Sequence, residues 1–467
     1  MNGASLREHG PSILVAALSS AFGVALLLMT GVLDVIIRAD EVTGSSSQTL
    51  PLMLTIVAFV FTTIAVYVAG VVTANTFGTI IAGRTRTIAL LRLIGSSAAA
   101  QRRAVGREGL LVGVVGSLVG AVAGTGLVAV AVAALIGLEV IDPLGYSFFS
   151  PVVLVPVAAV VLTTWAASWV GSRRVLVVTP MQALGSSVEA GFEEVTARRT
   201  RNGVAIALFV TGTALLVLGV LVGLVNPLGV LIGLVGGLLS FSGIVAGAHL
   251  VMPPALRLVG GLLGGSAAAR IAAENAMRYP ERSSRTTIGL VIGVTLVTMF
   301  SVAMETYRRI IEAAQRNNPE VYGGVDTVLL ITVVVFSVLI GFSAVIAAVG
   351  MVNNLSLSAL QRTRELGLLR ALGFTARQVR TMIVTESAQL TVAAVLVGVV
   401  LGIGYGGAGA QSMLGSINGS PGLIAPAVPL PLLLVLAVAS LGLTIGAAVT
   451  PARRATRVSP VVALAVE

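Results

Sequence analysis

Cysteine and lysine are both missing from this 467-residue chain, and charge of either sign is scarce. Without cysteine the chain has no disulfide, no thiol nucleophile and no cysteine metal site. All 29 basic residues are arginines, whereas a Walker A loop needs a lysine that reaches the terminal phosphates of ATP. We therefore predict that the chain does not hydrolyse ATP through a P-loop, and we expect no catalytic residue and no metal site in it.

Charged residues make up 10% of the chain and hydrophobic residues 56%. Soluble domains carry about 25% charged residues, so this composition cannot build a water-facing surface. The apolar residues come in runs of about 20, enough to cross a hydrocarbon core of roughly 30 Å. The sequence predicts an all-α polytopic membrane protein that is embedded in the lipid bilayer.

Predicted spans follow one another along the whole chain, about ten in number. The first is longer than the apolar region of a signal peptide, so we expect it to be retained. The predicted spans are Ser12–Ile37, Leu52–Ile81, Leu110–Leu138, Pro151–Val170, Val204–Val225, Gly229–Val251, Thr287–Glu305, Thr327–Val352, Leu390–Tyr405 and Leu430–Thr450.

The arginines indicate how these spans are oriented. With a cytoplasmic N-terminus, every arginine falls in a cytoplasmic segment except Arg38, Arg308, Arg309 and Arg316. Lys and Arg concentrate in cytoplasmic loops of membrane proteins, so the pattern favours an even number of spans with both termini inside (N-in/C-in). The same bias explains the net charge of +10 without a nucleic-acid partner.

An internal repeat divides the chain. Residues 84–95 read RTRTIALLRLIG and residues 362–373 read RTRELGLLRALG, 278 residues later. The same offset aligns Glu108 with Glu386, and Pro180 has its counterpart in Pro460. We predict a 4+2+4 arrangement: a first four-span half (1–185), a cytoplasmic linker (186–202), a two-span hairpin (203–252) and a second four-span half (253–467).

Each copy of the repeated motif predicts an elbow, meaning a short amphipathic helix, a tight turn and a second helix. Leu366, Leu369 and Leu372 share a helical face, and Gly373 suits a left-handed position after a helix. Thr375 to Gln378 has the form of a capping box, whereas in the first copy Ala100 stands where the glutamine would be. Pattern alone leaves two roles open for the elbows: binding anionic lipid headgroups or docking a cytoplasmic protein.

At RTRELGLLRALGFTARQV, with Glu386 downstream, and at PARRATRVSPVVALA near the C-terminus, the sequence resembles the FtsX-like permease family of ABC transporters. That family includes macrolide-exporter, lipoprotein-release and peptide-resistance permeases. The resemblance implies that each elbow is a coupling helix for a separate cytoplasmic ATPase subunit, two per chain, which would hold ATP and Mg²⁺. The chain itself would need no cofactor. The coupling residues implied by the resemblance are Arg86, Leu91, Arg92, Gly95, Arg364, Glu365, Leu366, Leu369, Arg370 and Gly373.

Two departures from the family pattern stand out. Thr87 occupies the place of Glu365, so the two elbows are not equivalent. The longest predicted outer stretches, Tyr307–Asp326 and Gly406–Val428, leave no room for the large extracytoplasmic domain of many family members.

Other polar and small residues have plainer expected roles. Asn75, Asn353 and Asn354 lie near the predicted cytoplasmic ends of spans, where they either bond neighbouring helices or contact substrate. Glycine stripes predict close helix packing: Gly116, Gly120 and Gly124 in the first half and Ala394, Gly398 and Gly402 in the second. The two histidines, His9 and His249, are expected at the interface or in solvent.

Three functions remain from the sequence. The first is the permease subunit of an ATP-driven transporter that exports or extracts hydrophobic or amphiphilic molecules, such as an antimicrobial peptide, a drug or a lipid. The second is an ATP-driven signalling or regulatory complex of the FtsX type. The third is a secondary transporter, which the scarcity of ionisable residues in the spans disfavours.

Overall fold

The structure is a computed structural model of the whole chain. It describes residues 10–39, 85–139, 141–172, 199–262, 280–319, 372–417, 420 and 422–457, with scattered positions at 56–75, 274 and 332–348. The regular secondary structure of these residues is helical, and no strand occurs among them. The helices are α2 (Gly10–Ala39), α5 (Thr85–Leu93), α6 (Ala98–Gly137), η1 (Pro151–Val153), α7 (Leu154–Gly171), α10 (Arg199–Gly223), α11 (Gly229–Ala246), α12 (Ala248–Leu262), α14 (Pro280–Asn317), α18 (Ala376–Leu414) and α19 (Leu430–Arg457).

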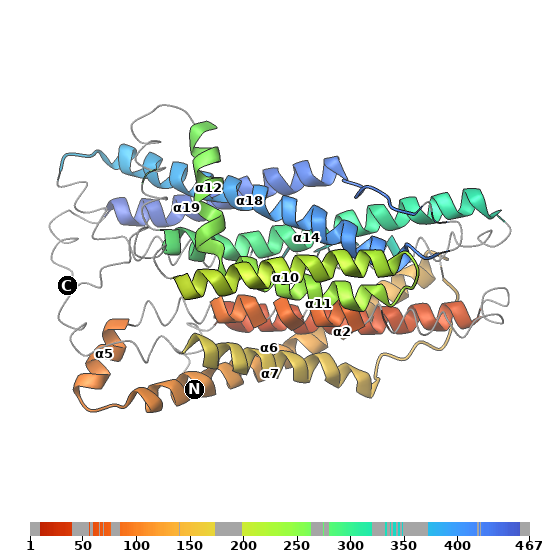
Figure 1. Cartoon of the computed structure of the whole chain (residues 1–467). Helices are drawn as coiled ribbons and strands as arrows, with labels where there is room; N and C mark the ends of the chain where they lie inside the picture. The colour runs from red at the N-terminus through yellow and green to blue at the C-terminus, as the bar shows by residue number, and fades with distance from the viewer. Residues whose placement is uncertain are drawn as a thin grey trace. The chain divides into compact units, whose positions relative to one another are not determined.

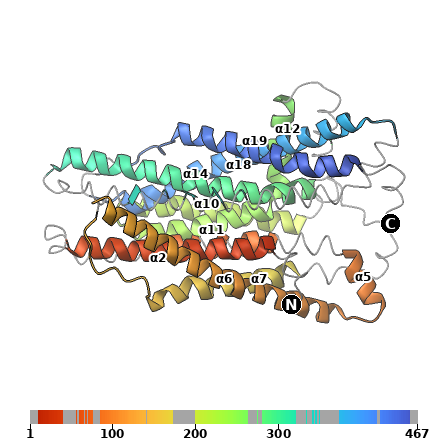
Figure 2. The same ribbon diagram turned by 180° about the vertical axis from the view of Figure 1, so that it is seen from behind.

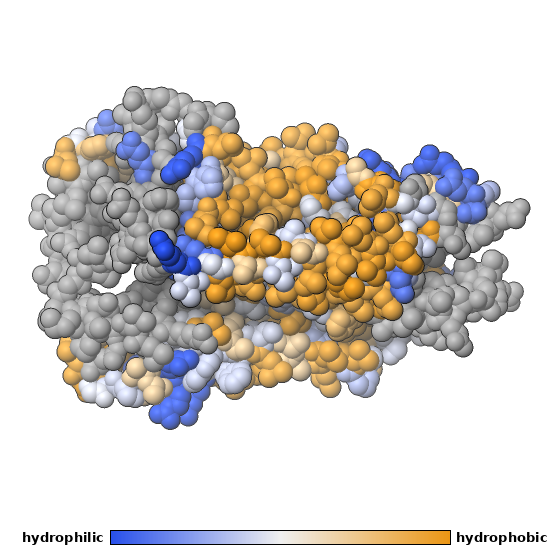
Figure 3. All heavy atoms as spheres, in the orientation of Figure 1, coloured by the Kyte–Doolittle hydropathy of each residue, from blue (hydrophilic) through white to orange (hydrophobic). Residues whose placement is uncertain are grey.

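Seven of the described helices are long and apolar enough to cross a membrane, and two shorter apolar helices cover Phe59–Asn75 and Leu430–Thr444. Figure 3 shows apolar side chains gathered over the middle of the long helices and hydrophilic ones toward their ends. The chain is thus a multi-pass membrane protein, as the composition predicts. The predicted span Thr327–Val352 lies largely outside the described residues.

Several helices run past the boundaries that hydropathy sets for the spans. The span expected at Leu390–Tyr405 belongs to the 39-residue α18, and Thr287–Glu305 belongs to the 38-residue α14. The outer stretch expected to begin at Tyr307 is therefore helical as far as Asn317. Hydropathy falls where charged residues begin, but backbone hydrogen bonding continues through them, which explains the difference.

The chain divides into two compact units, and the first contains α2, α5, α6 and α7. Within it α6 packs against both α2 and α7. The glycine stripe makes the contact with α2, since a Cβ at Gly116, Gly120 or Gly124 would meet backbone atoms of residues 13–21. The predicted role of this stripe in close packing is confirmed.

The second unit contains α10, α11, α12, α14, α18 and α19. Here α18 packs against α14 and α19, and a Cβ at Gly398 or Gly402 would meet Val294, Thr295 or Thr298 of α14. The helix α18 begins at Ala376, the repeat counterpart of Ala98 at the start of α6. Repeated sequence has therefore produced a repeated pair of long helices with the same glycine seam.

The two-helix insert, α10 and α11, is joined by a tight turn and packs along glycines from both helices. A Cβ at Gly212 or Gly219 of α10 would meet the α11 backbone at Ser240 or Gly233. The hairpin also contacts α18: the Tyr405 hydroxyl of α18 lies 2.9 Å from the Ser240 hydroxyl of α11. The insert thus belongs to the same unit as α14 and α18.

The helix α12 runs across the long helices of its unit rather than along them (Figures 1 and 2). The sequence places residues up to Val251 in a span, but α11 ends at Ala246 and a turn at Gly247 redirects the chain. One side of α12 is buried through Met252, Leu256 and Val259. The amide of Gln389 on α18 donates to the Leu256 carbonyl at 3.1 Å, which fixes α12 to α18.

His249 is buried at the start of α12, only 5% exposed, rather than solvated. Its Nδ1 lies 3.0 Å from a terminal nitrogen of Arg201, and its Nε2 lies 2.8 Å from Oδ1 of Asn202. A guanidinium can only donate, so Nδ1 accepts and Nε2–H donates to the asparagine. The histidine therefore ties the beginning of α10 to the beginning of α12.

Candidate functional site: the two elbows

The first elbow joins α5 to α6. Figures 1 and 2 show α5 turned away from the direction of α6. The turn centres on Gly95, whose φ of 100° is left-handed and costs glycine no steric clash. The Ser96 N–H donates to the Leu91 carbonyl at 2.9 Å, which is the six-to-one bond of a Schellman motif. The backbone thus closes α5 and sets a sharp change of direction.

A side-chain cap then starts α6 two residues later. The Ser97 hydroxyl accepts from the Ala100 N–H at 3.1 Å, and this satisfies one of the free amides at the helix start. The amide of Gln101 donates to the Ser96 hydroxyl at 2.8 Å. The bond that ends α5 and the cap that begins α6 lie only one residue apart. The backbone conformation of the turn is therefore restricted at both ends.

The second elbow has the same geometry where the structure describes it. Gly373 has φ of 97°, and the predicted capping box is present at the start of α18. The Gln378 N–H donates to the Thr375 hydroxyl at 3.2 Å, and the Thr375 N–H donates to Gln378 Oε1 at 2.9 Å. The predictions made for Gly373 and for the capping box are confirmed.

The structure places only part of the predicted coupling set. Leu91 is half-buried on α5, while Gly95 and Gly373 are exposed in their turns. Arg86 and Arg92 lie on α5, and their side chains are outside the described atoms. Also outside the described residues are Arg364, Glu365, Leu366, Leu369 and Arg370.

The structure also describes only part of the set of asparagines that are predicted to contact substrate. Asn75 is half-buried at the end of the helix Phe59–Asn75. Asn353 and Asn354 lie outside the described residues. Their role in binding substrate therefore stays a prediction.

Two apolar residues that sequence reasoning did not single out as a pair lie at the elbows. Ile94 and Leu372 each stand directly before the turn glycine, and their side chains are 81% and 78% exposed. Leu372 was expected on the same helical face as Leu366 and Leu369, and Ile94 was not singled out. Their shared position before the glycine is the signal that identifies them, because a residue at that position lies in the turn itself.

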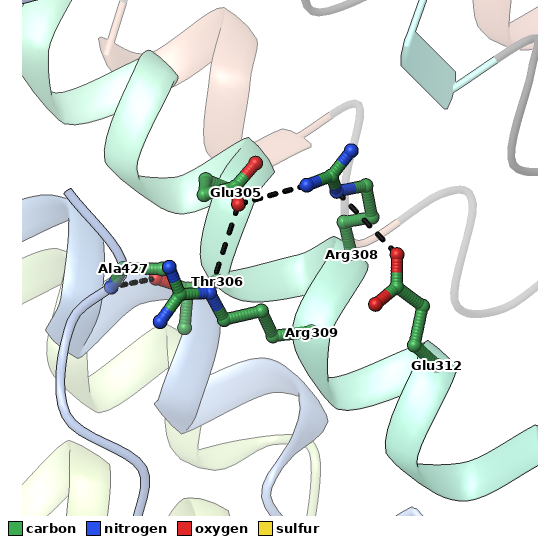
Figure 4. A network of polar contacts seen from close by, with 6 residues as sticks. All are labelled: Glu305, Thr306, Arg308, Arg309, Glu312 and Ala427. Carbon is green, nitrogen blue, oxygen red and sulfur yellow. Dashed lines mark hydrogen bonds and ion pairs between the residues drawn. The ribbon is translucent and has the colours of Figure 1, made fainter. Parts of the chain in front are cut away.

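A charged cluster lies at the other end of the second half, where α14 passes its apolar stretch (Figure 4). Glu305 pairs with Arg308 at 3.0 Å and with Arg309 at 3.6 Å, and Arg308 also lies 3.5 Å from Glu312. Such half-exposed pairs stabilise a helix only slightly. The Thr306 hydroxyl accepts from the Ala427 N–H at 3.0 Å, so α14 also holds the segment that leads into α19.

No group of histidine, aspartate and glutamate residues suited to a metal ion occurs among the residues placed by the structure.

Comparison with known sequences bears on these elbows directly. The FtsX-like permease C-terminal family matches residues 59–180 and 337–460, together more than half of the chain. The matches begin at the 278-residue offset that also separates Gly95 from Gly373. This chain belongs to the FtsX-like permease family. As an FtsX-like permease it is a multi-pass bacterial membrane protein of the ABC transporter class.

Three curated relatives resemble parts of this FtsX-like permease. An uncharacterized ABC transporter permease, YknZ of Bacillus subtilis, is 36% identical over 108 residues, covering 23% of this chain and 26% of the relative. The macrolide export ATP-binding/permease protein MacB of Hyphomonas neptunium is 32% identical over 136 residues, covering 28% and 20%. The ABC transporter permease YtrF of B. subtilis is 26% identical over 129 residues, covering 26% and 30%. The matched segments thus span less than a third of each relative.

Proposed function

We propose that this FtsX-like permease binds a separate cytoplasmic ATPase subunit at each elbow, two per chain, and that ATP hydrolysis there drives export or extraction of a hydrophobic or amphiphilic substrate. The single observation that carries the proposal is the exposed pair Ile94 and Leu372, one before each turn glycine. A large apolar side chain presented on a rigid turn fits a groove in a protein partner.

The position of the elbows favours a protein partner over lipid tails. Between the first turn and the apolar part of α6 lie Arg102, Arg103 and Arg107. About ten residues of helix correspond to roughly 15 Å, so the turn stands clear of the hydrocarbon. An exposed Ile94 at that height gains nothing from acyl chains, whereas a partner would bury it.

The proposed topology follows the repeat. We propose the 4+2+4 arrangement with both termini inside and with the boundaries 1–185, 186–202, 203–252 and 253–467, which puts both elbows on the cytoplasmic face. The two family matches and the paired helices α6 and α18 support it. ATP and Mg²⁺ would bind to the partner subunits, since this chain has no lysine for a Walker A loop.

The proposed substrate class rests on the spans and on one relative. The long helices expose aliphatic side chains, including Val122, Val130 and Val400, so molecules that partition into the bilayer can reach them laterally. The name of the MacB relative mentions macrolide export. Antimicrobial peptides, drugs and lipid-like molecules all belong to this amphiphilic class.

Copurification from the native host followed by an ATPase assay tests the proposal. We expect two ATPase subunits per permease and loss of both binding and activity when Ile94 and Leu372 are replaced by aspartate. Leu369→Glu and Arg370→Glu should weaken binding at the second elbow. The control is Leu138→Asp, an exposed apolar residue just beyond the opposite end of α6. A permease that purifies without an ATPase would instead support lipid-facing elbows and a secondary transporter.

A signalling function has one observation in its favour. The charged end of α14, from Glu305 to Arg316, extends as ordered helix past the apolar stretch and offers a polar surface. If this end binds an external enzyme whose activity follows ATP turnover, and no substrate is moved, the permease belongs to a regulatory complex. Replacing Arg308 and Arg309 by alanine would then abolish that response without affecting ATPase binding.

A further inference from the structure

Arg102 lies on the first turn and a half of α6, just after the Ser97 cap, and its side chain reaches the end of α7. The guanidinium carbon stands 4.3 Å from the centre of the Trp169 ring. Its Nε donates to the Ser172 hydroxyl at 3.2 Å, and Nη2 reaches the Trp169 carbonyl at 3.5 Å. One side chain therefore contacts the ring and the carbonyl of Trp169 and the hydroxyl of Ser172, the C-cap residue of α7.

The contact suits the end of a helix. The last carbonyls of α7 have no donor within the helix, and a cation near a helix C-terminus is electrostatically favoured. The Ser172 hydroxyl is fully buried and donates to the Trp169 carbonyl at 2.7 Å. Arg102, Ser172 and the Trp169 carbonyl thus form a closed set of hydrogen bonds under the indole.

Glycines on α6 bring the two helices close together beside this contact. A Cβ at Gly106 would lie 3.2 Å from the Trp169 ring, and one at Gly109 would collide with the Ser168 side chain. The first elbow is therefore mounted rigidly on α7 as well as on α6.

The repeat counterpart keeps the arginine but differs at the residues that surround it. Arg380 corresponds to Arg102 and is exposed. Toward the end of the repeat the offset is 280, as for Pro180 and Pro460, so Val449 and Ala452 stand where the first half has Trp169 and Ser172. Gly106 has Val384 as its counterpart. With no indole to stack on, the second half cannot make the arginine–tryptophan contact.

We propose that Arg102 is a positioning residue that locks the first elbow to α7, so that force received at this elbow moves α6 and α7 together, and that the second elbow lacks this arginine–tryptophan lock. This inference rests on the proposed function, since it assumes that an ATPase subunit pushes on the elbow. It names which half of the permease follows its ATPase more stiffly.

The experiment measures, for the complex of permease and ATPase in nanodiscs, both ATPase-subunit affinity and ATP turnover. Arg102→Ala should lower turnover about tenfold, on the scale of one charge-assisted hydrogen bond, while the dissociation constant stays within about twofold. Arg102→Lys keeps the charge but loses the planar fork, so it should be intermediate. Trp169→Phe keeps an aromatic face for the cation and should restore most of the turnover that Trp169→Ala loses.

Arg380→Ala is the matched control, because it removes the corresponding arginine from the half that lacks the lock, and it should change turnover less than twofold. A spectroscopic readout tests the contact itself. The chain has only two tryptophans, so Trp165→Phe leaves Trp169 as its single indole. Adding Arg102→Ala to that background should alter the Trp169 emission of the isolated permease.

Unchanged turnover in Arg102→Ala, with the ATPase still bound, would overturn the lock and leave the proposed function standing. Equal losses in affinity and turnover, or in the amount of folded permease, would overturn it too, because Arg102 would then act only on stability. If no ATPase binds the unmutated permease, the proposed function itself is wrong.

Discussion

The helices α6 and α18 come from the two copies of one repeat and start at equivalent positions, yet their surroundings differ. Within its unit α6 packs against α2 and α7, whereas α18 packs against α14 and α19 and is also covered by α10, α11 and α12. Gln389 of α18 is 1% exposed beneath α12, while its counterpart on α6, Leu111, is 43% exposed. Among the described residues, the repeat thus supplies a more exposed long helix in the first half and a braced one in the second.

The comparison shows which features the two copies of the repeat retain and which differ between them. Both copies keep the glycine seam and the elbow turn, which depend on backbone approach and on a left-handed residue. They differ in what the long helix is fastened to: Arg102 near the start of α6 stacks on Trp169 of α7, whereas Gln389 well along α18 is hydrogen-bonded to the transverse helix α12. Similar elbows are therefore attached to helices with different surroundings.

The largest expected effect is a loss of stability when the close helix packing at the glycine stripes is disturbed. Each half has its own stripe. Gly120→Ala and Gly402→Ala should each lower the free energy of unfolding by about 1–3 kcal/mol, because the new methyl would meet the neighbouring helix. Thermal stability in detergent measures this. The controls are Gly126→Ala and Gly404→Ala, which have open space and should be neutral or slightly stabilising, since alanine favours helix. Equal stability of the seam and control variants would contradict the close packing.

The next effect should appear in the braced half alone. Gln389→Leu removes the donor to the Leu256 carbonyl and leaves that acceptor buried, a cost of about 1–3 kcal/mol. Hydrogen exchange should then rise along α12. Leu396→Met, an exposed apolar change on the same helix, should leave α12 protected. An unaltered α12 in Gln389→Leu would mean that apolar burial alone holds it.

Removing the caps should have a smaller effect and should distinguish the elbows. Thr375→Ala breaks a reciprocal capping box, and Ser97→Ala breaks a single cap bond. Each substitution should destabilise the start of its helix by about 1 kcal/mol. The loss should be greater for Thr375→Ala, because a reciprocal box is broken there rather than a single bond. Faster exchange of the Gln378 and Ala100 amides would report it. A greater loss at Ser97 than at Thr375 would reverse the expected order.

The smallest expected effect tests whether the insert moves with the second half. The chain has no cysteine, so Gly233→Cys with Ser412→Cys gives one possible bridge. A Cβ at Gly233 would lie 3.7 Å from that of Ser412, within the spacing of disulfides. Oxidation should leave ATP turnover of the complex unchanged if α11 and α18 move as one body. Turnover that falls on oxidation and returns with reductant would show that they slide.

Much of the local design could be predicted from the sequence because it depends on short-range chemistry. The left-handed turn at Gly373 and the cap at Thr375 require particular residues within a few positions of one another, and both were confirmed. The glycine stripes were also predictable, since close helix approach leaves no room for a side chain. Span boundaries were less predictable, because charged helix ends continue the backbone hydrogen bonds that hydropathy does not detect.

Apolar run length, arginine placement and a repeated motif were enough to predict a helical, duplicated membrane protein, and the resemblance of that motif to FtsX-like permeases predicted its class. Three features became visible only once the helices were packed: α12 crosses its unit, His249 is buried between Arg201 and Asn202, and Arg102 reaches Trp169. Those contacts join residues 47 to 67 positions apart. No local pattern encodes them, because they depend on which helix faces which after packing.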